Sequence, residues 1–294
     1  MSVLPGATLD SVRDAARPLI DGEAGDYDAL LKLIADARLV LLGVPSYGTH
    51  EFFHARGEVT KRLIQDRGFT RLSIAADPAA VQPIDDFVKG RSADRLAADA
   101  LAELTVFPRW TWRNAEMLDF VGWLRSFNDQ FSGDTHKVSV CGIDVDRALN
   151  TVIWEHSRNV GDSRATDSDS PSLGQVARDR HGRRAFLVGF TTYTGTIVAA
   201  AEQDASAHRL RLDPPPADSV ETVCHAVALP RFQLFLRGAS DGLAQSLREP
   251  LLERMLDAVY PRTSGYLRAR LADQFDALIH FDETRSLEPL DTTF

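Results

Sequence analysis

Short apolar runs alternate with amphipathic stretches along most of the chain. The runs of strand length lie at residues 39–44, 70–75, 137–145, 152–154, 185–190, 194–200, 232–236 and 277–282. Helical periodicity covers residues 9–36, 51–67, 78–88, 114–127, 173–180 and 219–227. A TTYTG turn separates the two strands at 185–200, residues 161–172 form a loop, and 210–216 form an exposed link ending in three prolines. Alternating strands and helices favour an α/β fold with a largely parallel sheet flanked by helices, and we expect one domain over residues 1–294.

Composition narrows the class of protein. The 294 residues are 44% apolar and 26% charged, as in ordinary globular proteins. The net charge is −9 and no basic stripe occurs, which argues against nucleic-acid binding. No apolar run approaches the roughly 18 residues that span a bilayer, and the first residues lack a signal-peptide pattern. Cys141 and Cys224 are expected to be buried thiols, and the expected location is the cytoplasm.

Polar residues follow the first buried strand. The segment after Val44 contains Tyr47 and then His50, Glu51 and His54, which match the H-E-x-x-H pattern of zinc peptidases. In those enzymes the motif lies within a helix, whereas here it begins in a first turn after a glycine and lacks an evident third ligand. We therefore predict no metal site. The turn at 43–49 lacks the Lys-Ser/Thr pair of a phosphate-binding loop, so it is expected to be a tight turn with Thr49 capping the helix.

Two other segments contain candidate site residues. At the end of the strand at 152–154, Glu155, His156 and Asp162 could supply a base, an acid and an orienting group, although a histidine beside Trp154 is often structural. At residues 110–114, tryptophans with Arg113 suit an anion or an apolar ligand, and equally suit core packing.

Taken in order, these segments resemble the erythromycin esterase family. LLGVPSYGTHEFF at 41–53 is similar to the family's L-L-G-E-A-T-H-G-T-H-E-F-F, and WRNAEMLDF at 112–120 to its W-R-N-E-E helix. VCGIDV at 140–145 resembles its G-L-D-V strand, and WEHSRNVGDSRAT at 154–166 its W-A-H-N-S-H-V-G-D-A-R-A-T. Residues 266–290 resemble the family's C-terminal strand region. The resemblance implies the family's α/β fold and a history of lactone hydrolysis by a histidine-activated water.

Several of the family's catalytic positions are changed. Its Glu and His of the first signature fall on Val44 and Tyr47, a second Glu falls on Ala75, and a second His falls on Asn159. The polar residues retained are Glu51, Arg56, Asp77, Arg113, Asp144, His156 and Asp162, with His50 nearby. The family's long helical stretch before the W-A-H strand is reduced to residues 146–151. The cleft should therefore be shallower, or be completed by a second protomer in a homodimer.

Loss of several base and acid groups should abolish the ancestral water activation, since one general base contributes typically 10²–10⁴-fold in rate. We therefore expect an enzyme repurposed for cyclisation, elimination or isomerisation of a polyketide- or lactone-type small molecule. The alternatives are a hydrolase with a rebuilt site, with metal at His50 and His54 as one version, and a non-catalytic ligand-binding protein.

From these considerations we predict a role for each candidate residue, and we expect neither a cofactor nor a metal. His156 is predicted to be the base, Tyr47 the acid and Asp144 an orienting group, with His50 and Glu51 as further catalytic candidates. The predicted substrate-binding residues are Arg56, Trp112, Arg113, Asp77 and Asp162.

Overall fold

The protein is described here by a computed structural model that covers residues 6–20, 25–146, 148–260 and 265–291. Its strands are β1 (Arg17–Pro18), β2 (Leu39–Val44), β3 (Arg71–Ile74), β4 (Ser139–Gly142), β5 (Thr151–His156), β6 (Ala185–Ala199), β7 (His208–Arg211), β8 (Arg231–Phe235), β9 (Leu251–Arg254), β10 (Tyr266–Ala269) and β11 (Ala277–Thr284). Its α-helices are α1 (Gly6–Ala15), α2 (Asp28–Ile34), α3 (His50–Arg67), α4 (Pro78–Lys89), α5 (Ala97–Ala100), α6 (Ala115–Asn128), α7 (Ser157–Val160), α8 (Leu173–His181), α9 (Val220–His225), α10 (Asp241–Ser246) and α11 (Leu271–Gln274).

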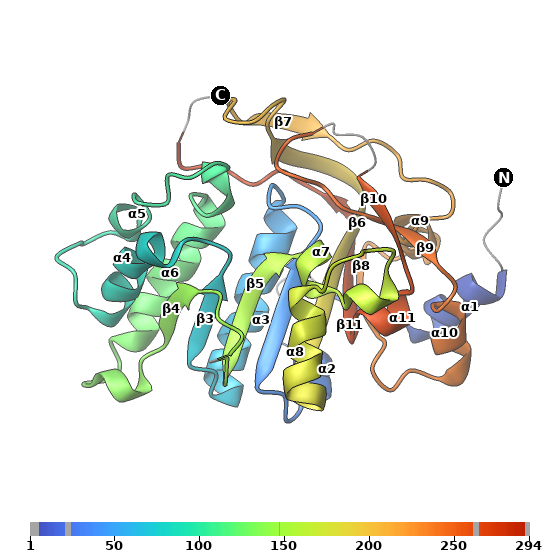
Figure 1. Cartoon of the computed structure of the whole chain (residues 1–294), viewed down its shortest axis with the longest axis horizontal. Helices are drawn as coiled ribbons and strands as arrows, with labels where there is room; N and C mark the ends of the chain where they lie inside the picture. The colour runs from blue at the N-terminus through green and yellow to red at the C-terminus, as the bar shows by residue number, and fades with distance from the viewer. Residues whose placement is uncertain (1–5, 21–24, 147, 261–264, 292–294) are drawn as a thin grey trace.

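Nine of the strands form one mixed sheet, in the order β1-β8-β11-β6-β2-β5-β3-β4, with β7 attached to β6 (Figure 1). The pairs from β11 through to β4 are parallel, and β1, β7 and β8 join antiparallel. A separate antiparallel pair consists of β9 and β10. The expected α/β fold with a largely parallel sheet is confirmed.

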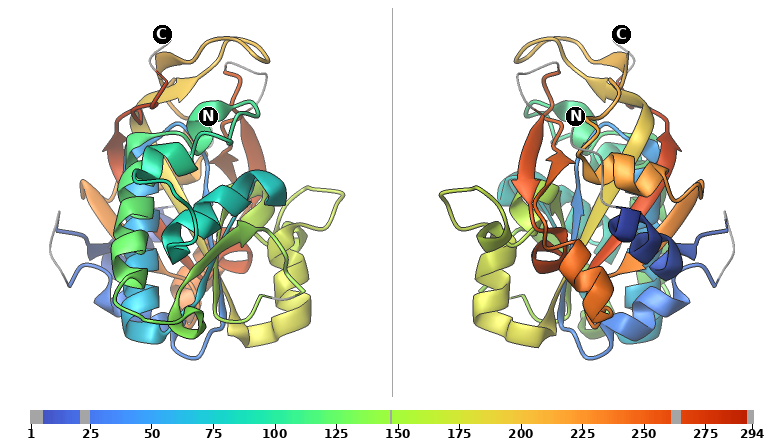
Figure 2. Two further views of the ribbon diagram at one scale, coloured as in Figure 1. Left: turned by 90° about the vertical axis from the view of Figure 1, so that its left-hand side faces the viewer. Right: turned by 90° about the vertical axis from the view of Figure 1, so that its right-hand side faces the viewer.

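Helices cover both faces of the sheet because its central strands are apolar on both faces. In β2 all six residues are buried; Val40 and Leu42 pack with α3 and α6, whereas Leu39 and Leu41 belong to the core on the opposite face. Figure 2 shows α3 and α6 on one side of the sheet and α8 on the other. The β4–β5 connection, at residues 143–150, contains no helix among its described residues, in agreement with the expected shortening.

Two predicted elements were wrong, and so was the expected cap: Thr49 precedes α3, but its side-chain oxygen has no hydrogen-bond partner among the described residues. Residues 185–200 do not form two strands around a turn, because β6 runs unbroken through Tyr193 and pairs with β11 as far as Gly195. Threonine and tyrosine favour strands, which explains why no turn forms there. Residues 9–36 do not form one helical stretch either, since Arg17–Pro18 pairs with β8 between α1 and α2.

Two further expectations concern cysteines and membranes. Both cysteines are free thiols, as expected; Cys224 is buried and Cys141 is half-buried. Of the helices that the structure describes, none combines the length and apolar character needed to cross a membrane.

Candidate active site

A cleft of about 670 Å³ lies at the carboxyl ends of β2, β3 and β5. The chain leaves β2 through α3 on one face of the sheet, whereas β5 continues into α7 and α8 toward the other face. Divergent connections of this kind open a crevice beyond the strand ends, which is where α/β folds bind ligands. The walls are largely apolar and come from residues 75–80, 104–112, 143 and 256–258.

A tyrosine–glutamate pair lies in this cleft. The phenol of Tyr47 donates a hydrogen bond of 2.5 Å to Glu155 Oε1, and the same oxygen accepts from the His156 amide at 2.6 Å. The pair forms because β2 and β5 are neighbours in parallel register, with Gly43 opposite Glu155. Burial, and then the nearby carboxylate, raise the pKa of Tyr47 well above its usual value. The phenol therefore keeps its proton and acts as a donor.

Arg56 lies fully buried close to this pair. Its guanidinium stacks on Phe53 and Trp154, with ring-centre distances of 4.3 and 4.9 Å, and more loosely on Trp112 at 5.9 Å. None of its nitrogens has a hydrogen-bond partner among the described residues. Burial lowers the pKa of Arg56 to about 10, while its attraction to Tyr47 and Glu155 opposes that shift. Arg56 thus remains a cation at neutral pH and is a buried counter-charge for Glu155.

His156 lies in the cleft wall, and the backbone occupies both of its nitrogens. Nδ1 accepts from the Arg158 amide at 3.2 Å, and Nε2–H is shared by the carbonyls of Pro45 and Leu256 at 3.1 and 3.2 Å. Burial lowers the pKa of the imidazole, which is therefore neutral. In this arrangement the ring presents no free nitrogen to a ligand.

Trp112 and Asp77, two of the residues predicted to bind substrate, also line the cleft. The Trp112 indole donates to the Ala75 carbonyl at 3.3 Å, which fixes the ring against the end of β3. Asp77 is exposed at the rim and caps α4 by accepting from the Ala79 amide at 2.8 Å.

Arg56, predicted to bind substrate, is fully buried and does not line the cleft, and three other predicted residues do not line it either. Arg113 forms a two-point ion pair with Asp291, at 2.8 and 2.7 Å, and so anchors the C-terminal segment. Asp162 is buried against Arg164 and Arg178, which hold its pKa below the usual range despite burial. Asp144 is exposed and accepts from the Asp146 amide.

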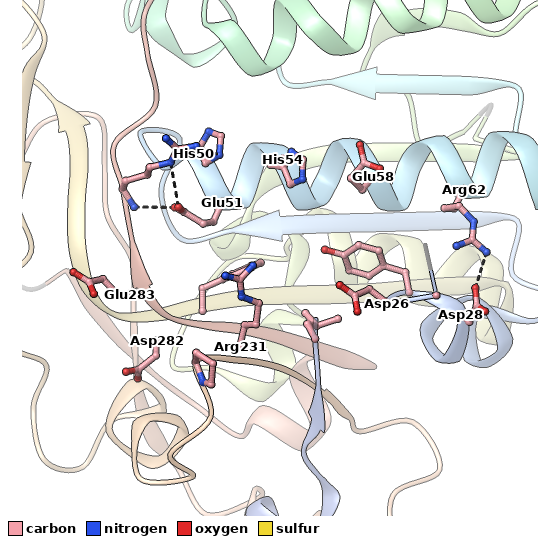
Figure 3. A pocket seen from close by; sticks show the side chains of 16 residues that line it. Asp26, Asp28, His50, Glu51, His54, Glu58, Arg62, Arg231, Asp282 and Glu283 are labelled. Atoms are coloured by element: carbon pink, nitrogen blue, oxygen red, sulfur yellow. Dashed lines mark hydrogen bonds and ion pairs between the residues drawn. The ribbon is translucent and has the colours of Figure 1, made fainter. Parts of the chain in front are cut away.

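His50 and Glu51 lie in a separate, larger groove of about 1320 Å³ (Figure 3). His50, Glu51, His54 and Glu58 line the groove from α3, whereas Arg56 and Phe53 face the core. His50 bonds Glu116 through Nδ1 and Arg285 through Nε2 at 2.6 Å, so both nitrogens are occupied. Among the described residues no cluster of His, Cys, Asp or Glu is arranged to hold a metal ion.

Two features of the cleft were not predicted as site residues. Glu155 was recognised as a candidate base but was not placed with Tyr47, because their contact depends on the β2–β5 register. The wall at 256–258 comes from a distant part of the chain. The hydrogen bond from the Leu256 amide to the Pro45 carbonyl, at 2.7 Å, brings it to the cleft. In the sequence, the position of Glu155 at the end of a buried strand pointed to a role in the site. No feature of the sequence pointed to residues 256–258.

Comparisons with known proteins agree with this architecture. The structure resembles a crystal structure of a Bacillus cereus protein, with a TM-score of 0.84, 15% identity, and 97% and 98% of the two chains covered. It also resembles a succinoglycan biosynthesis protein (TM-score 0.80, 14% identity, 96% and 97% covered). A mutant of the erythromycin esterase EreC in its open conformation is similar at a TM-score of 0.57 and 12% identity, with 89% and 94% covered. At these identities the likeness concerns the fold.

Sequence comparison identifies the family. The chain is 29% identical to erythromycin esterase type II of Escherichia coli over 127 residues, which is 43% of this chain and only 28% of that relative's length. The family model described as erythromycin esterase matches residues 64–151 and 146–284, two segments that meet at the short β4–β5 connection. The chain therefore belongs to the erythromycin esterase family.

Proposed function

We propose that this protein is an acid/base enzyme that isomerises, cyclises or eliminates from a small, largely apolar lactone- or polyketide-type substrate. The observation that carries the proposal is the hydrogen bond from Tyr47 to Glu155 in an apolar cleft. It pairs a phenol that keeps its proton with a carboxylate that can accept one.

The pair can act on a carbon next to a carbonyl group. A substrate carbonyl that replaces Glu155 as the acceptor of the Tyr47 hydrogen bond removes one donor from the carboxylate and leaves that oxygen free to accept a proton. Glu155 takes the proton from the carbon, and the developing enolate oxygen accepts the hydrogen bond from Tyr47. Return of the proton to another carbon gives isomerisation, and its transfer to a departing oxygen gives elimination. The positive charge of Arg56 stabilises the negative charge as it moves from the Glu155 carboxylate to the enolate oxygen.

His156, expected from the sequence to be the base, has a positioning role in this proposal. Its ring ties the turn at Pro45 and the wall at Leu256 to the end of β5, and Glu155 beside it takes the base role.

Hydrolysis is the second candidate reaction, and the position of the Glu155 carboxylate favours it. The family's Glu and His of the first signature fall on Val44 and Tyr47, while Glu155 stands where the family has Ala. Val44 and Glu155 lie on adjacent strands. A carboxylate has thus been lost from one strand end and gained on its neighbour, where it could activate water instead of a carbon acid.

The first test is mass-resolved product analysis with macrolactones, simple acyl esters and open-chain polyketide acids. Products of unchanged mass, or lighter by one water, support the proposal. Products heavier by one water favour hydrolysis, and ligand-dependent thermal stabilisation without turnover favours a binding protein.

With any substrate found, Glu155→Gln and Tyr47→Phe should each lower kcat by about 10²–10⁴-fold, because each removes one proton-transfer group. His54→Gln, which lies outside the cleft on α3, is the matched control and should keep full activity. Full activity in Glu155→Gln would remove Glu155 from the mechanism.

A further inference from the structure

Glu253 and Gln274 form a buried pair outside the cleft, and Glu253 precedes the cleft wall at 256–258 by three residues. Both residues are about 1% exposed, and Gln274 Nε2 donates to Glu253 Oε2 at 2.7 Å. The other oxygen of each group, Glu253 Oε1 and Gln274 Oε1, is buried and has no partner among the described residues. The carboxyl–amide pair therefore has one hydrogen bond and two buried acceptor oxygens without a donor.

One proton can satisfy both orphans. A carboxylic acid and a primary amide pair at two points, with N–H donating to one carboxyl oxygen and O–H donating to the amide oxygen. Leaving both acceptors unpaired in the interior would cost about 1–3 kcal/mol each. Burial, with a smaller contribution from Glu221, raises the pKa of Glu253 to about 8, although the bond from Gln274 opposes the shift.

The charged neighbours do not supply a counter-ion for Glu253. Glu221 of α9 accepts from the Arg254 amide and from Thr191, and burial raises the pKa of its carboxyl as well. The Arg254 guanidinium donates to the carbonyls of Tyr193 and Asp213. The other titratable groups around this cluster, Cys224 of α9 and Tyr266 of β10, have pKa values that burial raises, so they are uncharged at neutral pH.

The Gln274 side chain packs closely against Gly161. Gln274 lies against Gly161, where an added Cβ would lie 2.6 Å from Gln274 Nε2 and 2.7 Å from its Cγ. Its backbone is fixed as well, because its carbonyl accepts from the Asp162 amide and its own amide donates to Arg270. A proton on the Glu253 carboxyl can complete the pair while the Gln274 backbone stays in place.

This pair is linked to the cleft by the chain itself. Glu253 lies in β9, and three residues further along Leu256 begins the wall at 256–258. The wall is held to the cleft by hydrogen bonds from the Leu256 amide to Pro45 and from His156 to the Leu256 carbonyl. A displacement of β9 would therefore strain the contacts that close this side of the cleft.

From these contacts we propose that Glu253 and Gln274 are a proton-operated latch, which holds the 256–258 wall while the Glu253 carboxyl is protonated and releases it when that proton is lost. The proposal rests on the Glu253–Gln274 pair and on its link to the wall through β9, so it stands or falls independently of the reaction assigned to the cleft.

Hydrogen exchange tests the latch without a substrate. Amide exchange by mass spectrometry is measured at pH 7 and pH 9.5 and corrected for the intrinsic pH dependence of exchange. In the wild type, protection of residues 251–258 should fall at least about tenfold at the higher pH. In Glu253→Gln, whose amide pairs with Gln274 at two points at any pH, protection should stay constant. Glu283→Gln, an exposed carboxyl outside the cleft, is the matched control and should behave as the wild type.

Two results would overturn the proposal: unchanged protection of the wild type, or an equal loss in Glu253→Gln. Infrared spectroscopy gives a second test that needs no folded variant at position 253. The wild type should show a protonated-carboxyl band at pH 7 that survives in Glu221→Gln and disappears by pH 9.5. Absence of that band in Glu221→Gln at pH 7 would show that Glu253 is ionised.

Discussion

His156 illustrates how one residue can be recognised from sequence and yet take a different role in the structure. Its position at the end of β5 was expected to make it a base. In the folded chain, both nitrogens of the His156 ring instead form hydrogen bonds with the backbone of Pro45, Leu256 and Arg158. A histidine held in this way contributes to the shape of the cleft rather than to proton transfer.

This role predicts the behaviour of His156→Ala. The variant leaves the buried Leu256 carbonyl without a donor and removes one of the two donors to the Pro45 carbonyl, so we expect the free energy of unfolding to fall by about 1–3 kcal/mol, measured by urea denaturation. Asn159→Ala, at an exposed position in α7, the helix that follows His156, should change stability by less than about 0.5 kcal/mol. An inactive His156→Ala protein of wild-type stability would restore the histidine as the base.

At the scale of elements, α6 shows how a family motif can serve structure. The helix begins after Asn114, whose side chain accepts from the Met117 amide and donates to the carbonyls of Trp110 and Thr111. Asn114 is fully buried, so the cap also satisfies two carbonyls that water cannot reach. Arg113 beside it anchors Asp291, so the W-R-N segment positions the cleft wall through Trp112.

The substitution Asn114→Ala should therefore lower the free energy of unfolding by more than the loss of an exposed helix cap would. Loss of the cap contributes about 1 kcal/mol, and the two orphaned carbonyls add to it, so we expect about 2–4 kcal/mol in urea denaturation. Asp119→Ala, an exposed position on the same helix, serves as the comparison and should be close to neutral. Equal stability of the two variants would contradict the capping role.

The elements predicted well are those in which local pattern and tertiary environment agree. The apolar run at Leu39–Val44 became β2 with the same bounds, and α3, α4, α6 and α8 lie within a residue or so of their expected ranges. The prediction failed in β6, where strand length depends on pairing with β11. The same limit applied to the site. Tyr47 and His156 could be placed at strand ends, Trp112 in an aromatic segment and Asp77 through the family resemblance. The Tyr47–Glu155 contact, however, required the strand register, and the 256–258 wall required the tertiary fold.

At the scale of the whole molecule, buried titratable groups set the pH range of stability. Burial lowers the pKa values of His156 and His280. Both side chains therefore stay neutral in the folded chain at pH values where they are protonated in the unfolded chain, below about pH 6.5. Stability should fall as the pH drops from there. Glu253 acts in the opposite direction, because its raised pKa makes the folded chain retain a proton that the unfolded chain releases. Its contribution is complete below the unfolded pKa of about 4.5 and is lost progressively up to about pH 8.

Thermal denaturation between pH 5 and pH 9 checks this balance. Glu253→Gln carries no ionisable group at that position, so its melting temperature relative to the wild type should rise from pH 5 to pH 8 and then level off. A constant difference across the range would show that Glu253 titrates normally in the folded chain.

The position of β11 has a consequence for the order in which the fold can be built. This strand comes last among those described, yet it lies between β6 and β8, and it connects the β1–β8 pair to the rest of the sheet. During synthesis, β2 to β6 emerge first and leave one side of β6 without its long partner until the segment at Ala277–Thr284 leaves the ribosome. An uncovered strand edge invites pairing with other chains. The nascent chain therefore passes through a period in which this edge of β6 is uncovered, and the speed of translation between β6 and β11 should influence the yield of folded protein.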